Sequence, residues 1–313
     1  MSKINLGVIG LGHIFNEHYK VILKIKEFNI SGVFTKTNKN SFKFARKNKS
    51  VKVYKTIDEM MRDNRIQAVI VLVSPDESFN VIKKIIPYRK IFFTEKPVGL
   101  NFKQAKELLR LANKYKTLNM VGYNRRFYSV FEKGIEHIKK KGELYGILIE
   151  GHERFWKIKK RKTGKLLYNW IYANSTHTID LLRYFGGEFD KIFSIKNSIY
   201  NINGDQFSMI LKSKKKIIAT YVSNWYSPGG WSVKLFGDRI SAVFDPLEKG
   251  YLIDHRFNKT IIQPSKNDTE FKPGFYKQLI FFKKLILDKK LHWPAQDIKE
   301  TFETVKITKK ILS

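Results

Sequence analysis

A glycine-rich turn near the amino terminus constrains the fold of this chain most strongly. Residues 7–12 read GVIGLG, between the apolar run Ile4–Ile9 and a helical pattern that begins at His13. Gly10 permits a tight turn, Gly12 leaves the backbone bare where a pyrophosphate approaches, and the first N–H groups of the helix point at the phosphates. Strand, turn and helix in this order predict a dinucleotide site whose contacts are Gly10, Gly12, His13 and Ile14.

One position of this turn departs from the usual pattern. The third small residue, which allows close packing of helix against strand, is replaced by Phe15. We expect the Phe15 ring to point elsewhere or to push the helix slightly outward. An ordinary glycine turn without a ligand is the alternative interpretation.

The first 121 residues alternate between strand-like and helix-like segments. Residues 68–73 read AVIVLV, an apolar run typical of a strand that is buried on both faces of a parallel sheet. Thr56 with Glu59 and Asn101 with Gln104 are capping pairs that open two helices. The alternation predicts a doubly wound parallel sheet of the Rossmann type over residues 1–121.

The pattern changes after Tyr123. Long strand-like segments separated by hairpin-like turns predict a second, α+β domain over residues 122–313 with a large, mostly antiparallel sheet. The basic stretch Lys157–Lys165 is predicted to be a mobile loop over a site. Helices are expected at Phe275–Leu287 and Ala295–Leu312, and we expect the last one to pack back on the first domain.

The end of the second predicted strand bears on the choice of cofactor. An Asp or Glu usually stands there and binds the adenine ribose, but this chain has Thr35 and Lys36. No carboxylate is present to repel a 2′-phosphate, and Lys36 or Lys39 is available to pair with one. The segment therefore favours NADP over NAD, unless these lysines are merely part of a generally basic surface.

The formal net charge of +32 invites a nucleic-acid or membrane interpretation. The basic residues are spread from end to end rather than collected in one arm, which favours the interpretation that they reflect residue usage. We therefore expect no specific nucleic acid and no membrane partner. The chain has no cysteine, which excludes thiolate chemistry, and no metal site is predicted. With no signal peptide and no apolar run of about 20 residues, a cytoplasmic location is expected.

A lysine follows a strand that is predicted to be buried. Residues 91–98 read IFFTEKPV, so Lys96 lies at the carboxyl edge of the parallel sheet, where ligands bind. Its ammonium group can donate a hydrogen bond to a substrate hydroxyl or to a developing carbonyl oxygen. The alternative is that Lys96 is an ordinary surface lysine, which its position before Pro97 at the end of a buried strand disfavours.

Five motifs, taken together, resemble the Gfo/Idh/MocA family of oxidoreductases, and the resemblance covers essentially the whole chain. The motifs are GLGHIFNEH, SPDESF, TEKPVGLN, GYNRRF and STHTIDLLRYFGG. The resemblance implies that Lys96 contacts the reacting hydroxyl and that His177 acts as general acid/base. It also implies nicotinamide-side contacts from Ser74, Pro75, Glu95 and Asn124, and substrate contacts from Tyr123, Arg126, Asn174 and Asp180.

Two positions depart from the family pattern. The acid that often stands four residues before the histidine is Ala173, with Asn174 as the nearest polar neighbour, and a common histidine is replaced by Phe79. Loss of the acid indicates a different substrate geometry, a weaker base, or compensation by Asn174 and Asp180.

The resemblance implies an NAD(P)-dependent dehydrogenase or reductase acting on CH–OH groups. It would transfer a hydride between nicotinamide and a secondary alcohol or ketone of a sugar, cyclitol or sugar derivative. The alternative is a non-catalytic or regulatory NAD(P)-binding protein of the same fold. A homodimer or homotetramer is expected, because the open face of the second-domain sheet must be covered.

Overall fold

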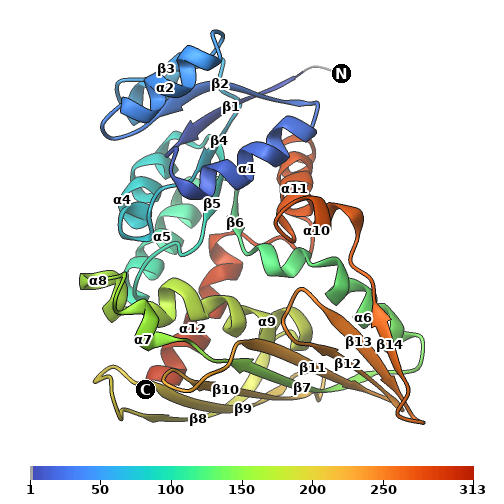
Figure 1. Cartoon of the computed structure of the whole chain (residues 1–313). Coiled ribbons are helices and arrows are strands. Elements are labelled where there is room, and N and C mark those ends of the chain that lie inside the picture. Colours follow the sequence, from blue (N-terminus) through green and yellow to red (C-terminus); the bar gives the residue numbers. More distant parts are fainter. Residues whose placement is uncertain (1–2) are drawn as a thin grey trace. The chain divides into compact units, whose positions relative to one another are not determined.

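The computed structural model describes residues 3–313 and divides them into two compact units. Of these residues, unit 1 contains 3–123 and 275–302, and unit 2 contains 124–274 and 303–313. Each unit is built around its own sheet (Figure 1). None of the helices in the described part of the chain combines the length and the apolar character that crossing a bilayer requires.

Unit 1 contains a six-stranded sheet in the order β3-β2-β1-β4-β5-β6, in which every pair of neighbours is parallel. This is the strand order of a doubly wound dinucleotide-binding fold, so the predicted fold class is confirmed for this unit. The central strands are buried on both faces because apolar residues fill every position of β4. The strands are β1 (Ile4–Ile9), β2 (Phe28–Phe34), β3 (Lys52–Val53), β4 (Ala68–Val71), β5 (Ile91–Glu95) and β6 (Asn119–Gly122).

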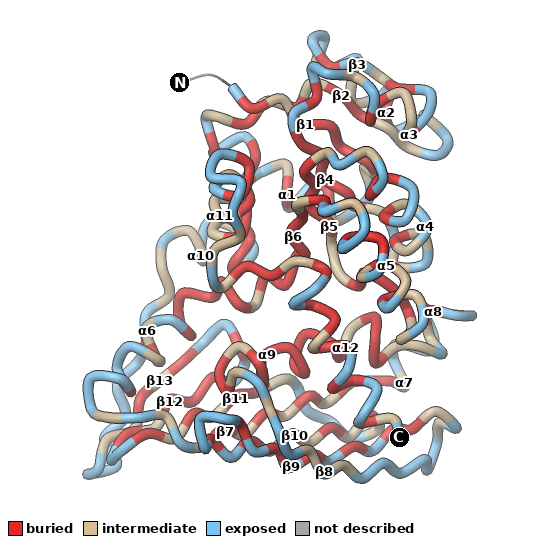
Figure 2. The backbone as a smooth tube through the Cα atoms, turned by 180° about the vertical axis from the view of Figure 1, so that it is seen from behind, coloured by how far each residue is buried: buried red, intermediate tan, exposed pale blue. Residues whose placement is uncertain are grey.

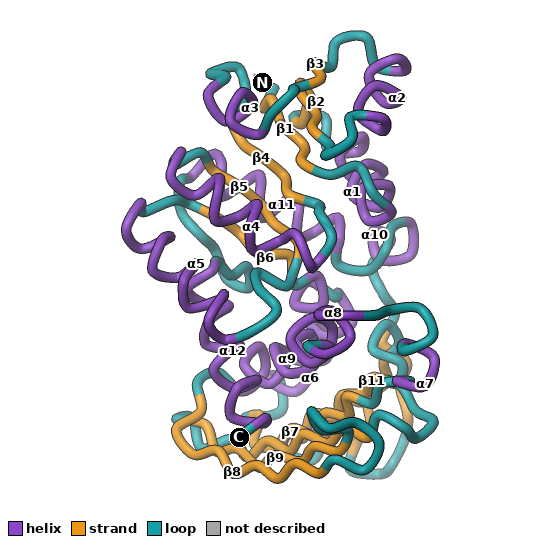
Figure 3. Tube along the Cα trace, turned by 90° about the vertical axis from the view of Figure 1, so that its left-hand side faces the viewer, coloured by secondary structure: helices purple, strands orange, loops and turns teal. Residues whose placement is uncertain are grey.

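Helices cover both faces of this sheet, with α3, α4 and α5 on one side and α1 and α11 on the other (Figure 3). The helices of unit 1 are α1 (His13–Lys24), α2 (Lys39–Lys47), α3 (Ile57–Arg62), α4 (Pro75–Ile85), the 3-10 turn η1 (Ile86–Tyr88), α5 (Phe102–Tyr115) and α11 (Phe275–Asp288). The first residues of α12 (Ile298–Leu312) also belong to this unit.

The two predicted caps are confirmed. The Thr56 hydroxyl accepts a hydrogen bond from the Glu59 N–H at 3.1 Å, and the Asn101 side chain accepts one from the Gln104 N–H at 2.9 Å. Helix α2, in contrast, was not predicted from the sequence, because its residues KNSFKFARK carry too few apolar side chains to show a helical stripe.

Unit 2 contains an eight-stranded sheet in the order β14-β13-β12-β11-β7-β10-β9-β8. All neighbours are antiparallel except β7 and β10, so the predicted mostly antiparallel sheet is confirmed. Burial alternates along β9, one face toward the core and one exposed, which Figure 2 shows as alternating colours. The strands are β7 (Leu144–Gly151), β8 (Phe189–Asn197), β9 (Gln206–Ser213), β10 (Ile218–Asn224), β11 (Trp231–Gly237), β12 (Ile240–Phe244), β13 (Gly250–Asp254) and β14 (Lys259–Ile262).

Two helices, α6 and α9, pack on the buried face of the second sheet. The helical elements of unit 2 are the 3-10 turn η2 (Asn124–Phe127), α6 (Ser129–Lys139), α7 (Phe155–Ile158), α8 (Gly164–Tyr168), the π-helical turn η3 (Ile171–Ser175), α9 (Thr176–Gly186) and α10 (Lys266–Glu270), together with the carboxyl-terminal part of α12. The stretch Lys157–Lys165, predicted to be a loop, overlaps the end of α7 and the start of α8.

Candidate functional site

The glycine turn after β1 has the geometry that a bound pyrophosphate requires. Gly10 has φ +96°, and a Cβ atom there would lie 2.6 Å from the backbone oxygen of Leu72, so only glycine fits. A Cβ at Gly12, in contrast, would meet no atom within 4 Å, which leaves open space beside the backbone. Gly12 is the N-cap of α1 and no side chain caps this helix, so the N–H groups of His13 and Ile14 remain available to a phosphate. The residues present therefore fit a dinucleotide.

The Phe15 ring packs in an aromatic cluster with Tyr19 of α1 and Phe44 of α2. Its ring stacks on Tyr19 with centroids 5.3 Å apart and meets Phe44 edge-on at 5.4 Å. The first of the two expectations for Phe15 therefore holds: the ring is 4% exposed and is packed sideways against α2.

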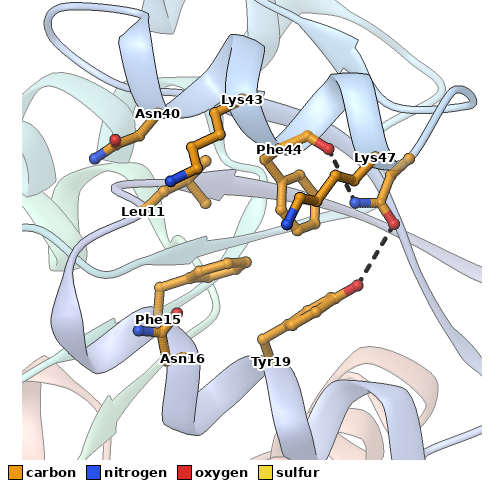
Figure 4. A pocket seen from close by; sticks show the side chains of 9 residues that line it. Leu11, Phe15, Asn16, Tyr19, Asn40, Lys43, Phe44 and Lys47 are labelled. Atoms are coloured by element: carbon orange, nitrogen blue, oxygen red, sulfur yellow. Dashed lines mark hydrogen bonds between the residues drawn. The ribbon is translucent and has the colours of Figure 1, made fainter.

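This cluster forms one wall of a cavity of about 520 Å³ beside the glycine turn. Figure 4 shows the ammonium groups of Lys43 and Lys47, one helical turn apart on α2, pointing into the space between α1 and α2. No carboxylate lies among the residues that line the cavity: Leu11, Phe15, Asn16, Tyr19, Asn40, Lys43, Phe44, Lys47 and Asn48. Its lining can therefore receive an anionic group beside an aromatic surface.

Thr35 and Lys36 follow β2, as the sequence predicted. The Thr35 hydroxyl shares a 2.8 Å hydrogen bond with the hydroxyl of Ser41. Lys36 is exposed, and its ammonium lies 3.5 Å from the Glu77 carboxylate, a weak surface contact that leaves the lysine available to a ligand.

The other predicted cofactor contacts of unit 1 follow β4 and β5, the two strands that come next to β1 in the sheet order. Ser74 is the N-cap of α4 and Pro75 its first residue, just after β4. Glu95 ends β5, and Lys96 follows it, half-buried, ahead of a cis bond to Pro97. Since all these strands are parallel, their carboxyl ends lie at the same edge of the sheet, together with the glycine turn. Tyr123, buried, follows β6 at that edge as well.

The carboxylate of Glu95 is held by a histidine beneath the sheet edge. Nε2 of His18, a fully buried residue of α1, lies 2.8 Å from Oε1 of Glu95. Gly122 of β6 leaves room for this carboxylate, because a Cβ there would lie 3.1 Å from Oε1. His18 of α1 therefore orients the carboxylate of Glu95.

In unit 2, Arg126 and Asp180 form a buried ion pair. Nε of Arg126 donates to Oδ2 of Asp180 at 2.7 Å, and the second guanidinium nitrogen donates to Oδ1 at 2.9 Å. The hydroxyl of Thr304 in α12 also donates to Asp180 at 2.8 Å, and both members of the pair are almost fully buried. The structure thus brings together two of the predicted substrate residues in a fork-shaped contact.

His177 lies near the amino end of α9, after the π-helical turn η3. It is 4% exposed, and its ring centroid is 6.0 Å from that of Trp231 on β11. Asn174, in η3, donates its amide to both carboxylate oxygens of Glu153, at 3.0 and 3.1 Å, and the Ser175 hydroxyl donates to the same carboxylate at 2.8 Å. π-helical turns occur frequently at functional sites.

Glu153 is a functional candidate that the sequence interpretation missed. It lies two residues after the end of β7 and is buried, yet the sequence placed it within a strand predicted over Leu144–Trp156. It supplies a carboxylate beside η3, the element that contains Ala173, the position at which the resembled family often has an acid. The only signal in the sequence was a lone acid in the basic segment HERFWKIKKRK.

Trp231, Asn174 and Glu153 share one cavity of unit 2, with a volume of about 690 Å³. Asn124 lies outside it, and its amide donates to the backbone oxygen of Pro273 at 3.0 Å. Arg125 enters the cavity with its guanidinium 4.5 Å from the centre of the Trp231 ring.

Comparison with known proteins gives one matching family, described as an oxidoreductase family with an NAD-binding Rossmann fold, over residues 4–123. The chain is 24% identical over 192 residues to a myo-inositol 2-dehydrogenase of Thermotoga maritima, covering 59% of this chain and 55% of that protein. The chain spans about half to two thirds of the length of the curated relatives it matches.

Two solved structures share the fold over nearly the whole chain. UDP-N-acetylglucosamine 3-dehydrogenase from Acidithiobacillus ferrooxidans has a TM-score of 0.78 at 16% identity, covering 99% of this chain and 97% of that one. Gal80p of Saccharomyces cerevisiae, in a super-repressor mutant, has a TM-score of 0.82 at 13% identity, covering 99% and 95%. At these identities the likeness shows the fold alone.

Proposed function

We propose that this chain is an NAD(P)-dependent dehydrogenase of the Gfo/Idh/MocA family of oxidoreductases, whose model matches residues 4–123. Its substrate would be a sugar, cyclitol or sugar derivative with a secondary alcohol or the corresponding ketone. In this proposal residues 1–121 bind the dinucleotide and residues 122–313 bind the substrate.

One observation supports the proposal: Lys96 lies at the same edge of the sheet as the glycine turn. Gly10 and Gly12 follow β1, Ser74 follows β4, and Lys96 follows β5, and these three strands are adjacent and parallel. A dinucleotide on the turn would extend along this edge, where Ser74, Pro75, Glu95 and Asn124 are the proposed contacts of its nicotinamide half. An ammonium group at this position can donate a hydrogen bond to a substrate hydroxyl, which favours an enzyme over a protein that only binds the cofactor.

The bound nicotinamide would supply or accept the hydride. Lys96 would donate a hydrogen bond to the oxygen of the reacting alcohol or ketone, and His177 would hold or release the hydroxyl proton.

The remaining predicted residues have supporting roles in this proposal. Tyr123 would form part of the substrate pocket at the sheet edge, and Asn174, held by Glu153, would bind a substrate hydroxyl. Because Arg126 and Asp180 occupy each other's hydrogen-bonding groups, we propose that the pair positions α9, and with it His177.

We propose NADP rather than NAD as the preferred cofactor. Thr35 and Lys36 present no carboxylate to a 2′-phosphate, and the cavity beside the glycine turn adds Lys43 and Lys47. Two ammonium groups and Lys36 near the adenosine end would favour the extra phosphate charge.

We also propose that the chain forms a homodimer or homotetramer through the open face of the second sheet. Phe193 of β8 and Ile210 of β9 are directly paired across the strands and are 65% and 56% exposed. Ile195 of β8 extends this apolar surface, which a second copy would cover.

The variant Lys96→Ala tests the function. Turnover of NADPH with a panel of keto-sugars should fall by about 10²–10⁴-fold, the usual contribution of a positioned proton donor. NADPH affinity, measured by fluorescence titration, should stay within about two-fold, since the glycine turn carries most phosphate contacts. Lys106→Ala, on the exposed side of α5, is the matched control.

Unchanged turnover in Lys96→Ala would refute the proposed mechanism. Tight binding of NADPH by the unaltered protein, with no oxidation by any ketone of the panel, would favour the regulatory alternative instead.

A further inference from the structure

The cavity of unit 2 is large enough for a substrate bigger than a single sugar. Its volume of about 690 Å³ lies in the upper half of the range of about 300–1,000 Å³ typical of small-molecule sites. Its lining residues are Arg125, His152, Glu153, Arg154, Lys157, Ile158, Arg161, Trp170, Asn174, Gly229, Gly230, Trp231, Pro246, Leu247 and Glu248.

One wall of this cavity is a row of three cations. Arg154 precedes α7, Lys157 lies within it, and Arg161 follows it, a spacing that places all three on one side of helical backbone. The backbone hydrogen bonds from Ile158 N–H to Arg154 O, at 3.2 Å, and from Arg161 N–H to Ile158 O, at 2.9 Å, keep this stretch wound. At about 1.5 Å per residue, the row is about 10 Å long.

These three cations have no carboxylate partner. Over residues 3–313, Arg154, Lys157 and Arg161 form no ion pair, whereas exposed basic residues of unit 1 such as Lys52 and Lys84 do, with Glu59 and Asp58. The two carboxylates that line the cavity are engaged elsewhere: Glu153 accepts from Asn174 and Ser175, and Glu248 accepts from Tyr128 at 3.2 Å. The row therefore presents positive charge to whatever enters the cavity.

The rest of the lining suits the uncharged part of a sugar. Trp231 presents a large ring beside His177, and Trp170 adds a second aromatic side chain. The Asn174 amide, anchored on Glu153, is a polar group of fixed orientation. The cavity thus has a sugar-binding end, at Trp231 and Asn174, and a cationic wall.

We propose that the substrate of this site is a sugar that carries a phosphate or diphosphate group, held by Arg154, Lys157 and Arg161. A carboxylate is satisfied by one guanidinium in a two-point contact, whereas a row of cations about 10 Å long matches the several oxygens and the higher charge of phosphate groups. This inference rests on the proposed dehydrogenase function and specifies its substrate class.

The test compares two variants of equal charge change. In the first, Arg154, Lys157 and Arg161 are all replaced by Gln. In the second, the control, Lys160, Lys162 and Lys165 are replaced by Gln; these lysines are exposed on the same segment and do not line the cavity. Inorganic pyrophosphate and glucose 1-phosphate are titrated calorimetrically into the full chain with saturating NADP+, which occupies the phosphate-binding turn of unit 1.

The first variant should bind both probes about 100-fold more weakly or worse, since each lost contact is a charge-assisted hydrogen bond, and the control should change by less than about three-fold. In turnover assays, the preference for a phosphorylated sugar over its unphosphorylated counterpart should fall by a similar factor in the first variant only.

Equal losses in both variants would overturn the inference, because they would indicate a generally basic surface. So would efficient turnover of neutral sugars without any advantage for phosphorylated ones, a result that leaves the dehydrogenase proposal standing. Retention of a random-sequence RNA that depends on the three cations, with no binding of either probe, would overturn it as well. Cavity-specific binding of the probes without oxidation or reduction of any sugar would instead overturn the dehydrogenase proposal and leave the anion site.

Discussion

Replacing Asp180 by Asn should strongly destabilise unit 2, although the two side chains have nearly the same shape. The carboxylate accepts two hydrogen bonds from Arg126 and one from Thr304, and both members of the ion pair are buried. An amide whose oxygen takes the Oδ1 position keeps the bonds from Nη2 of Arg126 and from Thr304. It loses the charge-assisted bond from Nε, which contributes about 1.5–3 kcal/mol, and turns an NH2 group toward that N–H. The Arg126 charge also stays buried without compensation, a situation that costs about 3–5 kcal/mol in other proteins. We expect a loss of about 3–5 kcal/mol.

Urea unfolding followed by tryptophan fluorescence would measure this loss. Four of the five tryptophans, Trp156, Trp170, Trp225 and Trp231, lie in unit 2, so the signal reports mainly on that unit. With a slope of about 2 kcal/mol per molar urea, the midpoint should fall by about 2 M. Asp190→Asn, the same change at an exposed position of β8, should alter stability by less than about 0.5 kcal/mol.

A loss of less than about 1 kcal/mol in the free energy of unfolding for Asp180→Asn would refute the reasoning, because it would mean that water reaches the ion pair. A further comparison separates the loss of the pair from the burial of a lone charge. Replacing both partners with apolar residues, Arg126→Met with Asp180→Leu, should recover much of the stability that the single change removes.

Two other predictions concern the glycine turn and the buried carboxylate of unit 2. Gly10→Ala should lower the free energy of unfolding of unit 1 by about 1–3 kcal/mol, because a Cβ atom there meets the Leu72 backbone at a positive φ. Gly12→Ala should leave this free energy nearly unchanged and weaken NADPH binding. Equal effects of the two variants on NADPH binding and on melting would contradict this. Glu153→Gln should lower kcat/KM, because the amide replaces one of the two carboxylate oxygens that hold Asn174 and Ser175 in η3. Reduced stability with an unchanged kcat/KM would mean a purely structural role.

The sequence was sufficient for the first sheet because each of its signals is local. The apolar run of β4, the capping residues Thr56 and Asn101, and the glycine turn depend on neighbours in the chain, and the structure has them where they were expected. Helix α2 was missed for the opposite reason. It is completed by a contact between Phe44 and Phe15, 29 positions apart in the chain, which no periodicity shows.

The same distinction applies to the candidate site. Lys96 and the glycines are candidates because motifs mark them, and the parallel strand order explains why they share an edge. Glu153 was missed because it takes its meaning from Asn174, 21 residues later and on another element. The sheet register of unit 2 was equally hidden, since the parallel pairing of β7 with β10 depends on strands more than 60 residues apart.

The charge of +32 shows why composition alone could not identify an anion site. Lysines and arginines are abundant in both units, and many of them lie beside carboxylates, as Lys52 does beside Glu59 and Arg65 beside Asp63. Such pairs are locally neutral and, being exposed, attract ligands weakly in physiological salt. The basic segment from Arg154 to Arg161 differs from these pairs in two ways: Arg154, Lys157 and Arg161 form no ion pair within residues 3–313, and they lie along a concave wall, where the field of like charges is concentrated. What distinguishes a binding site on so basic a chain is therefore the grouping of unpaired cations along one cavity wall, a property of the fold that a count of residues does not contain.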